Sequence, residues 1–298
     1  MFDVISFGSA VLDIFLDTGL REKGKFMAYP VGEKLQVRDM EFYVGGGGTN
    51  TAVAFSRLGL KTGYLGKIAD DFSGKKILEN LKKEKVEFLG VFEKGSKGGY
   101  SIILDSKEKD RTVLTYKGVN EEIKFSEINL KKLKTKWIYL SSFLGRSFET
   151  EKRLAKKLHS QGVKIAFNPS SYLIKAKNLG EILKITEVLI LNKDEAKLLT
   201  KEKDLVRGLK KLGPKKVIIT DGKNTAWYFD GTRRISVKPK KIRVVEETGA
   251  GDAFASGFVA GQIVGKSVEE SLKLGQEESE SVIRHFGAKN NLIKRKIK

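Results

Sequence analysis

Short apolar runs alternate with helical patterns along most of the chain. Continuous apolar runs, typical of strands buried on both faces, occupy residues 2–8, 62–66, 137–143, 163–169, 187–192 and 216–220. Helical patterns occupy residues 48–59, 72–84, 147–160, 193–200 and 250–263. The repeated order of strand and then helix predicts an α/β fold, with a mostly parallel central sheet covered by helices on both faces.

Two stretches interrupt this alternation, at residues 13–44 and 98–117. The second resembles a hairpin, because the segments GGYSIILD and RTVLTYKG are joined by the charged turn SKEKD. Alternation of apolar and polar positions predicts a small antiparallel sheet with one polar face. We expect the two stretches to form one flap over the main sheet. Two unrelated surface hairpins are the alternative.

The composition excludes several classes of protein. The 298 residues are enough for one large domain, or a domain with a small appendage. No apolar run approaches the roughly 20 residues that span a bilayer. The first apolar stretch also lacks the preceding basic region that a secretory signal carries. Without cysteine there are no disulfides or cysteine-ligated metals, and two histidines are too few for a multi-histidine metal site. We therefore expect a cytoplasmic protein without a membrane partner.

The chain is strongly basic, with 57 Lys and Arg against 37 Asp and Glu and a formal net charge of +20. Such a charge is compatible with binding nucleic acid, anionic lipid or phosphorylated small molecules. The lysines are dispersed, however, and pairs such as Lys82-Lys83 and Lys156-Lys157 fall on the solvent side of expected helices. We interpret the charge as a solvated surface and do not expect a nucleic-acid partner. Arg111, in the expected hairpin, either contacts a substrate anion or keeps a strand edge soluble.

The strongest chemical signal is the segment EETGAGD, from Glu246 to Asp252, followed by the small-residue pattern AFASGFVAG. Small residues at a helix start let backbone N–H groups point at an anion, where the helix dipole adds positive charge. A carboxylate at the head of the same helix can accept a proton beside that anion. This combination suits phosphoryl transfer, with Asp252 deprotonating the attacking hydroxyl. The structural alternative is a glycine-rich loop with Asp252 as a helix N-cap.

A second signal is the run of four glycines at residues 45–48, followed by Thr49 and Asn50. Glycines adopt backbone conformations closed to other residues and let a ligand contact the main chain. Asn50, one turn into the expected helix, offers a donor and an acceptor to sugar hydroxyls. A flexible hinge is the alternative interpretation.

A third pattern, AGQIVGKS at residues 260–267, fits a relaxed P-loop. A true P-loop follows a strand and opens a helix, whereas this segment follows the expected helix 250–263. Gly265 is placed to end that helix, and Ser267 with Glu270 matches a capping box that opens the next one. We therefore predict a turn between two helices.

The glycine run and the EETGAGD segment together resemble the two signature motifs of the ribokinase-like (PfkB-type) carbohydrate kinase family, in the usual order. The resemblance covers nearly the whole chain. Further matches are Gly8-Ser9 with Asp13, Gly66 with Asp70-Asp71, Asn192-Lys193-Asp194-Glu195, Thr220-Asp221-Gly222 and Gly287-Ala288.

The resemblance implies a three-layer ribokinase-like sandwich with a small β-sheet lid, which closes over the substrate and pairs with a second copy in many relatives. The main domain would comprise residues 1–12, 45–97 and 118–298, and the lid residues 13–44 and 98–117. The implied activity is ATP-dependent transfer of the γ-phosphoryl group to a hydroxyl of a small sugar. A nucleoside kinase of the same family is the alternative; from a different class, a non-catalytic nucleic-acid-binding or sugar-sensing protein is another.

The resemblance also implies residue roles. Asp252 resembles the catalytic base, and the anion hole around the transferred phosphoryl would be formed by Gly249, Ala250 and Gly251. The sugar-holding positions are Asp13, Gly46, Gly47 and Asn50. Asn192 and Glu195 match the motif that organises Mg²⁺ and phosphate, largely through water. The nucleotide positions are Thr220 and Gly222 for phosphates and ribose, and Gly287 to Asn290 for the adenine.

Three departures from the family pattern qualify these expectations. Gly47 stands where ribokinases proper usually carry Lys, which weakens an assignment to ribose. Thr225 replaces the second glycine of the nucleotide-site pattern. Glu246 stands at a position where Asp is common in the family. In some members that Asp helps to hold a monovalent cation, so a K⁺ site near Glu246 and Thr248 is one expectation to test.

Overall fold

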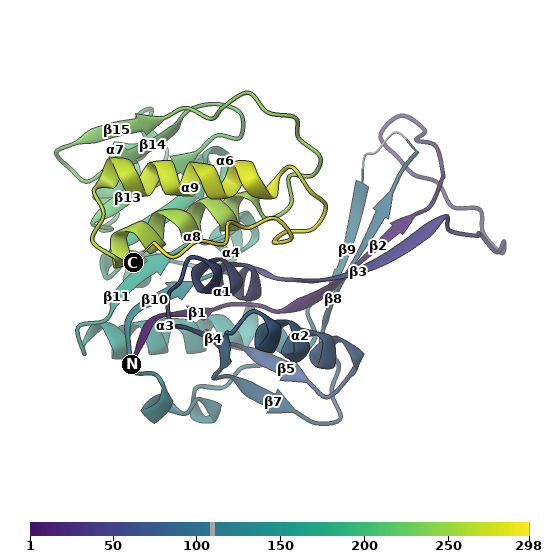
Figure 1. The fold of residues 1–298 in the computed structure, drawn as a ribbon, viewed down its shortest axis with the longest axis horizontal. Coiled ribbons are helices and arrows are strands. Elements are labelled where there is room, and N and C mark those ends of the chain that lie inside the picture. Colours follow the sequence, from purple (N-terminus) through teal and green to yellow (C-terminus); the bar gives the residue numbers. More distant parts are fainter. Residues whose placement is uncertain (108–110, 298) are drawn as a thin grey trace.

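The main body of the protein is built on one nine-stranded sheet. The structure, a computed structural model, describes residues 1–107 and 111–297 (Figure 1). In spatial order the strands of this sheet are β15 (Arg234–Val237), β14 (Ala226–Phe229), β13 (Lys216–Thr220), β12 (Val188–Asn192), β11 (Lys164–Phe167), β10 (Thr135–Leu140), β1 (Phe2–Phe7), β4 (Thr62–Leu65) and β6 (Glu87–Phe88). In this spatial order the strands from β13 to β6 run parallel, whereas β14 and β15 add two antiparallel strands at one edge.

Helices cover both faces of this sheet and complete the predicted three layers. One face carries α1 (Gly47–Arg57), α2 (Phe72–Lys83), α8 (Ala250–Ile263) and α9 (Val268–Val282). The other carries α3 (Gly145–His159), α4 (Ser171–Ala176), α5 (Gly180–Lys184), α6 (Lys193–Leu199) and α7 (Leu205–Lys211).

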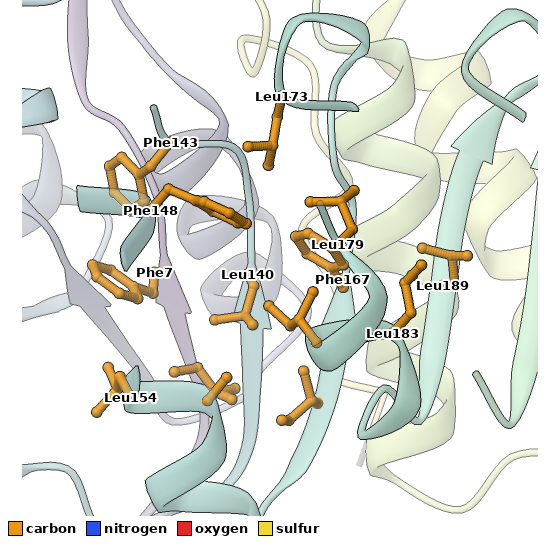
Figure 2. Packing of buried hydrophobic residues seen from close by; sticks show 14 of the residues in the cluster. Phe7, Leu140, Phe143, Phe148, Leu154, Phe167, Leu173, Leu179, Leu183 and Leu189 are labelled. Atoms are coloured by element: carbon orange, nitrogen blue, oxygen red, sulfur yellow. The ribbon is translucent and has the colours of Figure 1, made fainter. Parts of the chain in front are cut away.

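Alternate residues of each strand supply the two cores. In β10, Ile138 and Leu140 join the core beneath α3 to α7, part of which is shown in Figure 2, whereas Trp137 and Tyr139 join the core beneath α1 and α8. Since both faces are covered, the central strands read as continuous apolar runs in the sequence.

A second, four-stranded sheet projects from one side of the main body (Figure 1). In spatial order its strands are β3 (Asp39–Gly45), β2 (Val11–Asp17), β8 (Gly99–Asp105) and β9 (Arg111–Tyr116). The pairs β2–β3 and β8–β9 are antiparallel, and the central pair β2–β8 is parallel. The two interrupting stretches therefore form one sheet rather than two unrelated hairpins. The predicted turn SKEKD includes residues 108–110, which lie outside the described residues.

Several boundaries differ from the sequence prediction. The strand predicted at 137–143 ends at Leu140, and the strand predicted at 163–169 ends at Phe167, because the polar residues that follow leave the sheet. A two-stranded sheet of β5 (Lys67–Ala69) and β7 (Val91–Glu93) was not predicted. Three short 3₁₀ helices, at Gly118–Glu121, Phe125–Glu127 and Leu130–Lys132, also were not.

The turn between α8 and α9 has the predicted form. Gly265 adopts a positive φ of 79°, and the Ser267 side chain accepts a hydrogen bond from Glu270 N–H as part of a capping box. The P-loop interpretation of this segment is therefore excluded. In the described part of the chain, every helix is too short or too polar to cross a bilayer.

Candidate active site

A cavity of about 460 Å³ lies where the carboxyl ends of the main strands meet the base of the small sheet. This is the edge at which open α/β sheets bind ligands. The predicted site residues that line it are Asp13, Gly46, Gly47, Asn50, Asn192, Glu195, Thr220, Gly249, Gly251 and Asp252. The two signature segments, far apart in sequence, therefore border one cavity.

The first turns of α1 and α8 meet at this cavity. Asn50, in α1, donates a hydrogen bond from Nδ2 to Oδ2 of Asp252, in α8, over 2.9 Å. The other amide atom, Oδ1 of Asn50, is buried and has no hydrogen-bond partner in the described structure. Asp252 lies within the first turn, and Gly249 occupies the N-cap position, so the interpretation of Asp252 as an N-cap is wrong.

Opposing influences act on the carboxyl of Asp252. Burial raises its pKa above the ordinary value, while the hydrogen bond from Asn50 and the charge of Lys289 lower it in part. A carboxylate with a raised pKa accepts a proton more readily than an exposed aspartate does. The position therefore suits a general base.

The glycine run is a steric requirement of the site. A Cβ added to Gly45 would lie 1.9 Å from Oδ2 of Asp13. Gly46 has a φ of 94°, and a Cβ there would lie 2.5 Å from the carbonyl oxygen of Ser9. The main chain at these positions packs directly on the residues beside the cavity, which a flexible hinge would not require.

Asp13 lies on β2 at the mouth of the cavity and is only 8% exposed. Burial raises its pKa to about 6, although a hydrogen bond from Ser101 and the charge of Lys289 act in the opposite direction. The small sheet thus presents a buried carboxyl group to the same cavity that Asn50 and Asp252 line.

The start of α8 supplies part of the predicted anion hole. The N–H of Ala250 donates to the carbonyl of Glu247 over 3.2 Å, and Ala250 does not line the cavity. Gly251 lines the cavity, and its N–H belongs to the first helical turn, which offers no intrahelical acceptor. Of the three predicted positions, Gly249 and Gly251 border the space that a phosphoryl group would occupy.

Asn192 and Glu195 form a capping box at the start of α6. The Asn192 side chain accepts from Glu195 N–H, and Oε2 of Glu195 accepts from Asn192 N–H, both over 2.9 Å. Burial raises the pKa of Glu195. Both residues line the cavity, so this half-buried carboxylate fits a Mg²⁺ ion that keeps most of its waters. No cluster of three or more carboxylate or histidine side chains suited to a metal occurs among residues 1–107 and 111–297.

Glu246 already has a cationic partner. It is 7% exposed, accepts hydrogen bonds from the N–H and Oγ1 of Thr248, and forms an ion pair with Arg111 of the small sheet. Although burial acts in the opposite direction, the bonds from Thr248 and Arg111 hold its pKa below the ordinary range. A K⁺ ion at this carboxylate does not fit, because a guanidinium group occupies that place. Arg111 itself lines the cavity and is thus more than a strand-edge residue.

Three predicted nucleotide residues lie outside this cavity. Gly222 follows β13, and Gly287 and Asn290 belong to the segment after α9. Asn290 donates from Nδ2 to the carbonyl of Phe286 over 2.6 Å. Of the residues predicted to bind the nucleotide, only Asn192 and Thr220 reach the cavity wall.

The positions of two lysines near the site were not predicted from the sequence: Lys117 was not singled out, and Lys289 lay within the range Gly287 to Asn290 expected for the adenine. Lys117, after β9, lines the cavity with its Nζ 5.0 Å from the ring centroid of Tyr172, and burial lowers its pKa. Lys289 is 5% exposed and donates from Nζ to Oγ1 of Thr49 over 3.0 Å. Among 57 basic residues, neither carries a local pattern that separates it from a surface lysine; Lys289 only follows the matched pair Gly287-Ala288.

Comparisons with known proteins place this architecture in context. The sequence model of "pfkB family carbohydrate kinase" matches residues 1–295. An "uncharacterized sugar kinase" of Archaeoglobus fulgidus is 30% identical over 250 residues, covering 80% of this chain and 98% of that protein. Two solved structures share the fold. Ribokinase of Arabidopsis thaliana, complexed with ribose and ATP, has a TM-score of 0.85 and 21% identity, covering 97% of this chain and 95% of that one. A "putative Ribokinase II" of E. coli, in complex with ATP and Mg²⁺, has a TM-score of 0.83 and 17% identity, covering 97% of this chain and 95% of that one.

Proposed function

The chain belongs to the pfkB family of carbohydrate kinases, and from this premise we propose that its cavity holds the reacting hydroxyl of a small sugar against Asp252. The family membership makes the protein an ATP-dependent phosphotransferase with an alcohol acceptor. The proposal concerns which residues perform that reaction here.

Asp252 acts as the general base. Oδ2 is engaged by Asn50, so Oδ1 is the oxygen that takes the proton of the sugar hydroxyl. The hydroxyl oxygen then bonds to the γ-phosphorus of ATP, and the bond from that phosphorus to the β,γ-bridging oxygen breaks, which releases ADP. Asp13 and Asn50 orient the sugar, with Gly46 and Gly47 forming the floor on which it lies.

The start of α8 stabilises the transferred group. The N–H groups of Gly249 and Gly251 lie at the positive end of the helix dipole and stabilise the negative charge of the transferred phosphoryl group. Thr220 and Asn192 line the side of the cavity from which ATP enters, and Gly222, Gly287 and Asn290 hold the rest of the nucleotide farther out. Ala250 supports this turn through its bond to Glu247.

Asn192 and Glu195 would hold Mg²⁺, largely through water, and the ion would supply positive charge for the phosphate oxygens of ATP. A K⁺ ion at Glu246 is not part of the proposal, because Arg111 neutralises that carboxylate. Since ATP is the donor, we place the enzyme in the cytoplasm.

The small sheet acts as a lid. Residues 13–44 and 98–117 would form this unit, and residues 1–12, 45–97 and 118–298 the main domain. Two observations support a role in covering the sugar: Asp13 and Arg111 of the small sheet line the cavity, and Arg111 pairs with Glu246 of the main body. Closure would exclude water from the transferred phosphoryl group.

A second copy of the chain is the proposed partner of the lid. One face of the small sheet lines the cavity, and the opposite face carries a row of apolar side chains in register across all four strands: Phe42, Ile14, Ile102 and Leu114. Phe42 and Leu114 are 43% and 52% exposed. A small sheet normally has one polar, solvated face, so this apolar face favours a homodimer through the lid.

The observation that carries the proposal is the 2.9 Å bond between Asn50 and Asp252 at the wall of the cavity. The test is a phosphoryl-transfer screen with ATP and Mg²⁺ across ribose, fructose, 2-keto-3-deoxygluconate, phosphosugars and nucleosides, read as ADP release with product identified by mass. We expect a sugar to be phosphorylated. Transfer only to nucleosides would overturn the substrate class, and salt-sensitive nucleic-acid binding without any transfer would favour the non-catalytic alternative.

A further inference from the structure

Lys289 lies behind the active site, in the segment that follows α9. Its carbonyl oxygen accepts a hydrogen bond from Nη1 of Arg57 over 2.8 Å. The preceding residue, Ala288, packs against the turn that starts α8, since a Cβ on Gly249 would lie 2.7 Å from the Cα of Ala288. The main chain of Lys289 is thus fixed between α1 and the anion-binding turn.

The side chain of Lys289 points into the protein. Its Nζ donates to Oγ1 of Thr49 over 3.0 Å, and Thr49 Oγ1 donates onward to the carbonyl of Gly45 over 2.7 Å. Gly45 packs directly on the carboxyl of Asp13. The residue after Thr49 is Asn50, which donates to Asp252. The ammonium group therefore sits behind the first turn of α1, which contacts Asp252 through Asn50, and close to the end of β3, where Gly45 packs on Asp13.

A buried ammonium needs compensating charge. Within the described residues, no carboxylate forms a direct ion pair with Lys289, and Thr49 is its side-chain hydrogen-bond partner. Burial lowers the pKa of Lys289 to about 7, while Asp13 on β2, Glu84 after α2 and Asp252 on α8 raise it and Arg57 on α1 lowers it. In return, the charge of Lys289 lowers the pKa of both Asp13 and Asp252.

We propose that Lys289 is a positioning residue that keeps Asp252 and Asp13 ionised, acting as a buried positive charge behind the first turn of α1. The inference rests on the proposed role of Asp252 as the general base. A base buried in the cavity wall must lose its proton before it can accept one from a hydroxyl. The ammonium group favours that loss without touching the substrate.

Other charged or titratable groups face the same carboxylates. The charge of Asp252 raises the pKa of Glu195 of α6, and also that of Tyr139 of β10 and Tyr172 of α4. Asp13 faces Ser101 of β8 and Glu246 of the loop before α8. The acidic neighbours, Glu195 and Glu246, oppose ionisation, so Lys289 is the cation that acts on both carboxylates.

The test is a carboxyl-carbon NMR titration of the full chain labelled at the aspartates, with Asp252→Asn and Asp13→Asn used to assign the two signals. In Lys289→Met we expect the titration midpoints of Asp252 and Asp13 to rise by about one pH unit or more, as loss of a nearby unit charge produces. Lys289→Arg should keep the parent midpoints. Unchanged midpoints in folded Lys289→Met would overturn the proposal.

Lys67 provides the matched control. It is 2% exposed and pairs with Glu93 and Glu127, and it lines a different cavity. Lys67→Met should lower stability without moving the Asp252 midpoint. If Lys67→Met moved that midpoint as far as Lys289→Met does, loss of any buried lysine would produce the shift. The proposed role of Lys289 would then be wrong.

The reciprocal measurement decides the matter even where Lys289→Met does not fold. Since coupled groups shift one another, Asp252→Asn and Asp13→Asn should each lower the titration midpoint of the Lys289 ammonium, followed by NMR of its side chain. A midpoint that stays unchanged in both variants would overturn the proposal.

A kinetic readout separates this inference from the proposed function. With the sugar found in the screen, the acid limb of kcat/KM should shift upward in Lys289→Met by the same amount as the Asp252 midpoint, with the alkaline plateau retained. A uniform loss of kcat/KM at every pH would indicate a merely structural role. A shifted Asp252 midpoint without any phosphoryl transfer would leave the electrostatic role intact and contradict the kinase assignment instead.

Discussion

The carboxyl of Asp252 is the group on which the proposed chemistry depends. Asp252→Asn preserves the side-chain shape and can still accept the bond from Asn50, so we expect normal folding. It cannot take a proton, and kcat should fall by about 10²–10⁴-fold, the usual contribution of a general base. The measurement is kcat on the sugar found in the screen, together with a thermal melt. A folded variant that keeps the parent rate would show that another group accepts the proton.

The sequence predicts some site residues and misses others for a physical reason. Asp252 and the glycine run each belong to a short sequence pattern, and the residues of that pattern are enough to predict a chemical role. The pairing of Arg111 with Glu246 and the burial of Lys289 join residues distant in the chain, and only the fold brings them together. Gly222, Gly287 and Asn290 were predicted from resemblance, and they are not among the residues that line the cavity.

At the scale of elements, the contact between β9 and the loop before α8 joins the small sheet to the main body. Arg111→Gln would leave the buried carboxylate of Glu246 without its cation, which is the unfavourable way to break such a pair. We expect weaker closure of the lid, seen as a KM for the sugar raised about tenfold with a smaller change in kcat. Hydrogen exchange in β9 should rise in parallel.

Glu246→Gln provides the control for this prediction. Gln keeps the shape of the acceptor and removes the charge that Arg111 neutralises. If the pair acts as a unit, the double variant should be less impaired than the sum of the two single variants. Strict additivity would show that Arg111 and Glu246 act independently, and that the ion pair does not hold the lid.

The buried acid of α9 makes stability depend on pH. Oε1 of Glu278 has no partner in the described structure, and burial raises the pKa of this group to about 8 from 4.5. The unfolded chain releases the proton above pH 4.5 and the folded chain keeps it to about pH 8. The free energy of unfolding should therefore be highest, as far as this group is concerned, below pH 4.5 and decline as the pH rises to 8.

Glu278→Gln should flatten this decline and raise the free energy of unfolding at pH 8 by at least about 1 kcal/mol. Chemical denaturation at pH 5 and pH 8 measures the slope. Glu269→Gln, at a 57% exposed position of the same helix, is the control and should leave the slope unchanged. An equal slope in the parent and in Glu278→Gln would contradict the prediction.

The elements themselves were predictable to different degrees. Long apolar segments, such as α8 and the central strands, match the sequence prediction because burial on both sides keeps them apolar throughout. The strands β5 and β7, each of three residues, are too short to show a period. The prediction ran β10 too far because Phe143, which is buried although it lies beyond the end of the strand, continues the apolar run in the sequence.

At the scale of the whole molecule, the order of elements along the chain gave the class of fold but not the order of strands. That order depends on which helix crosses which face, and the sequence carries no local record of it. The parallel contact between β2 and β8 is an example, because it joins the two interrupting stretches through a pairing that neither stretch predicts alone.

The apolar outer face of the small sheet leads to a prediction about assembly. Ile102 and Leu114 are cross-strand neighbours on the face opposite the cavity. Covering that face by a second copy would remove exposed apolar area from water. Burying a lysine side chain in the same interface would cost more desolvation free energy than the apolar contact supplies. We therefore expect the parent chain to sediment as a dimer and Leu114→Lys as a monomer. Leu130→Lys, at a 37% exposed position on the main body, is the control and should remain dimeric. A parent chain that is monomeric at high micromolar concentration would contradict the prediction, and dissociation of both variants alike would show that the interface does not lie on the small sheet.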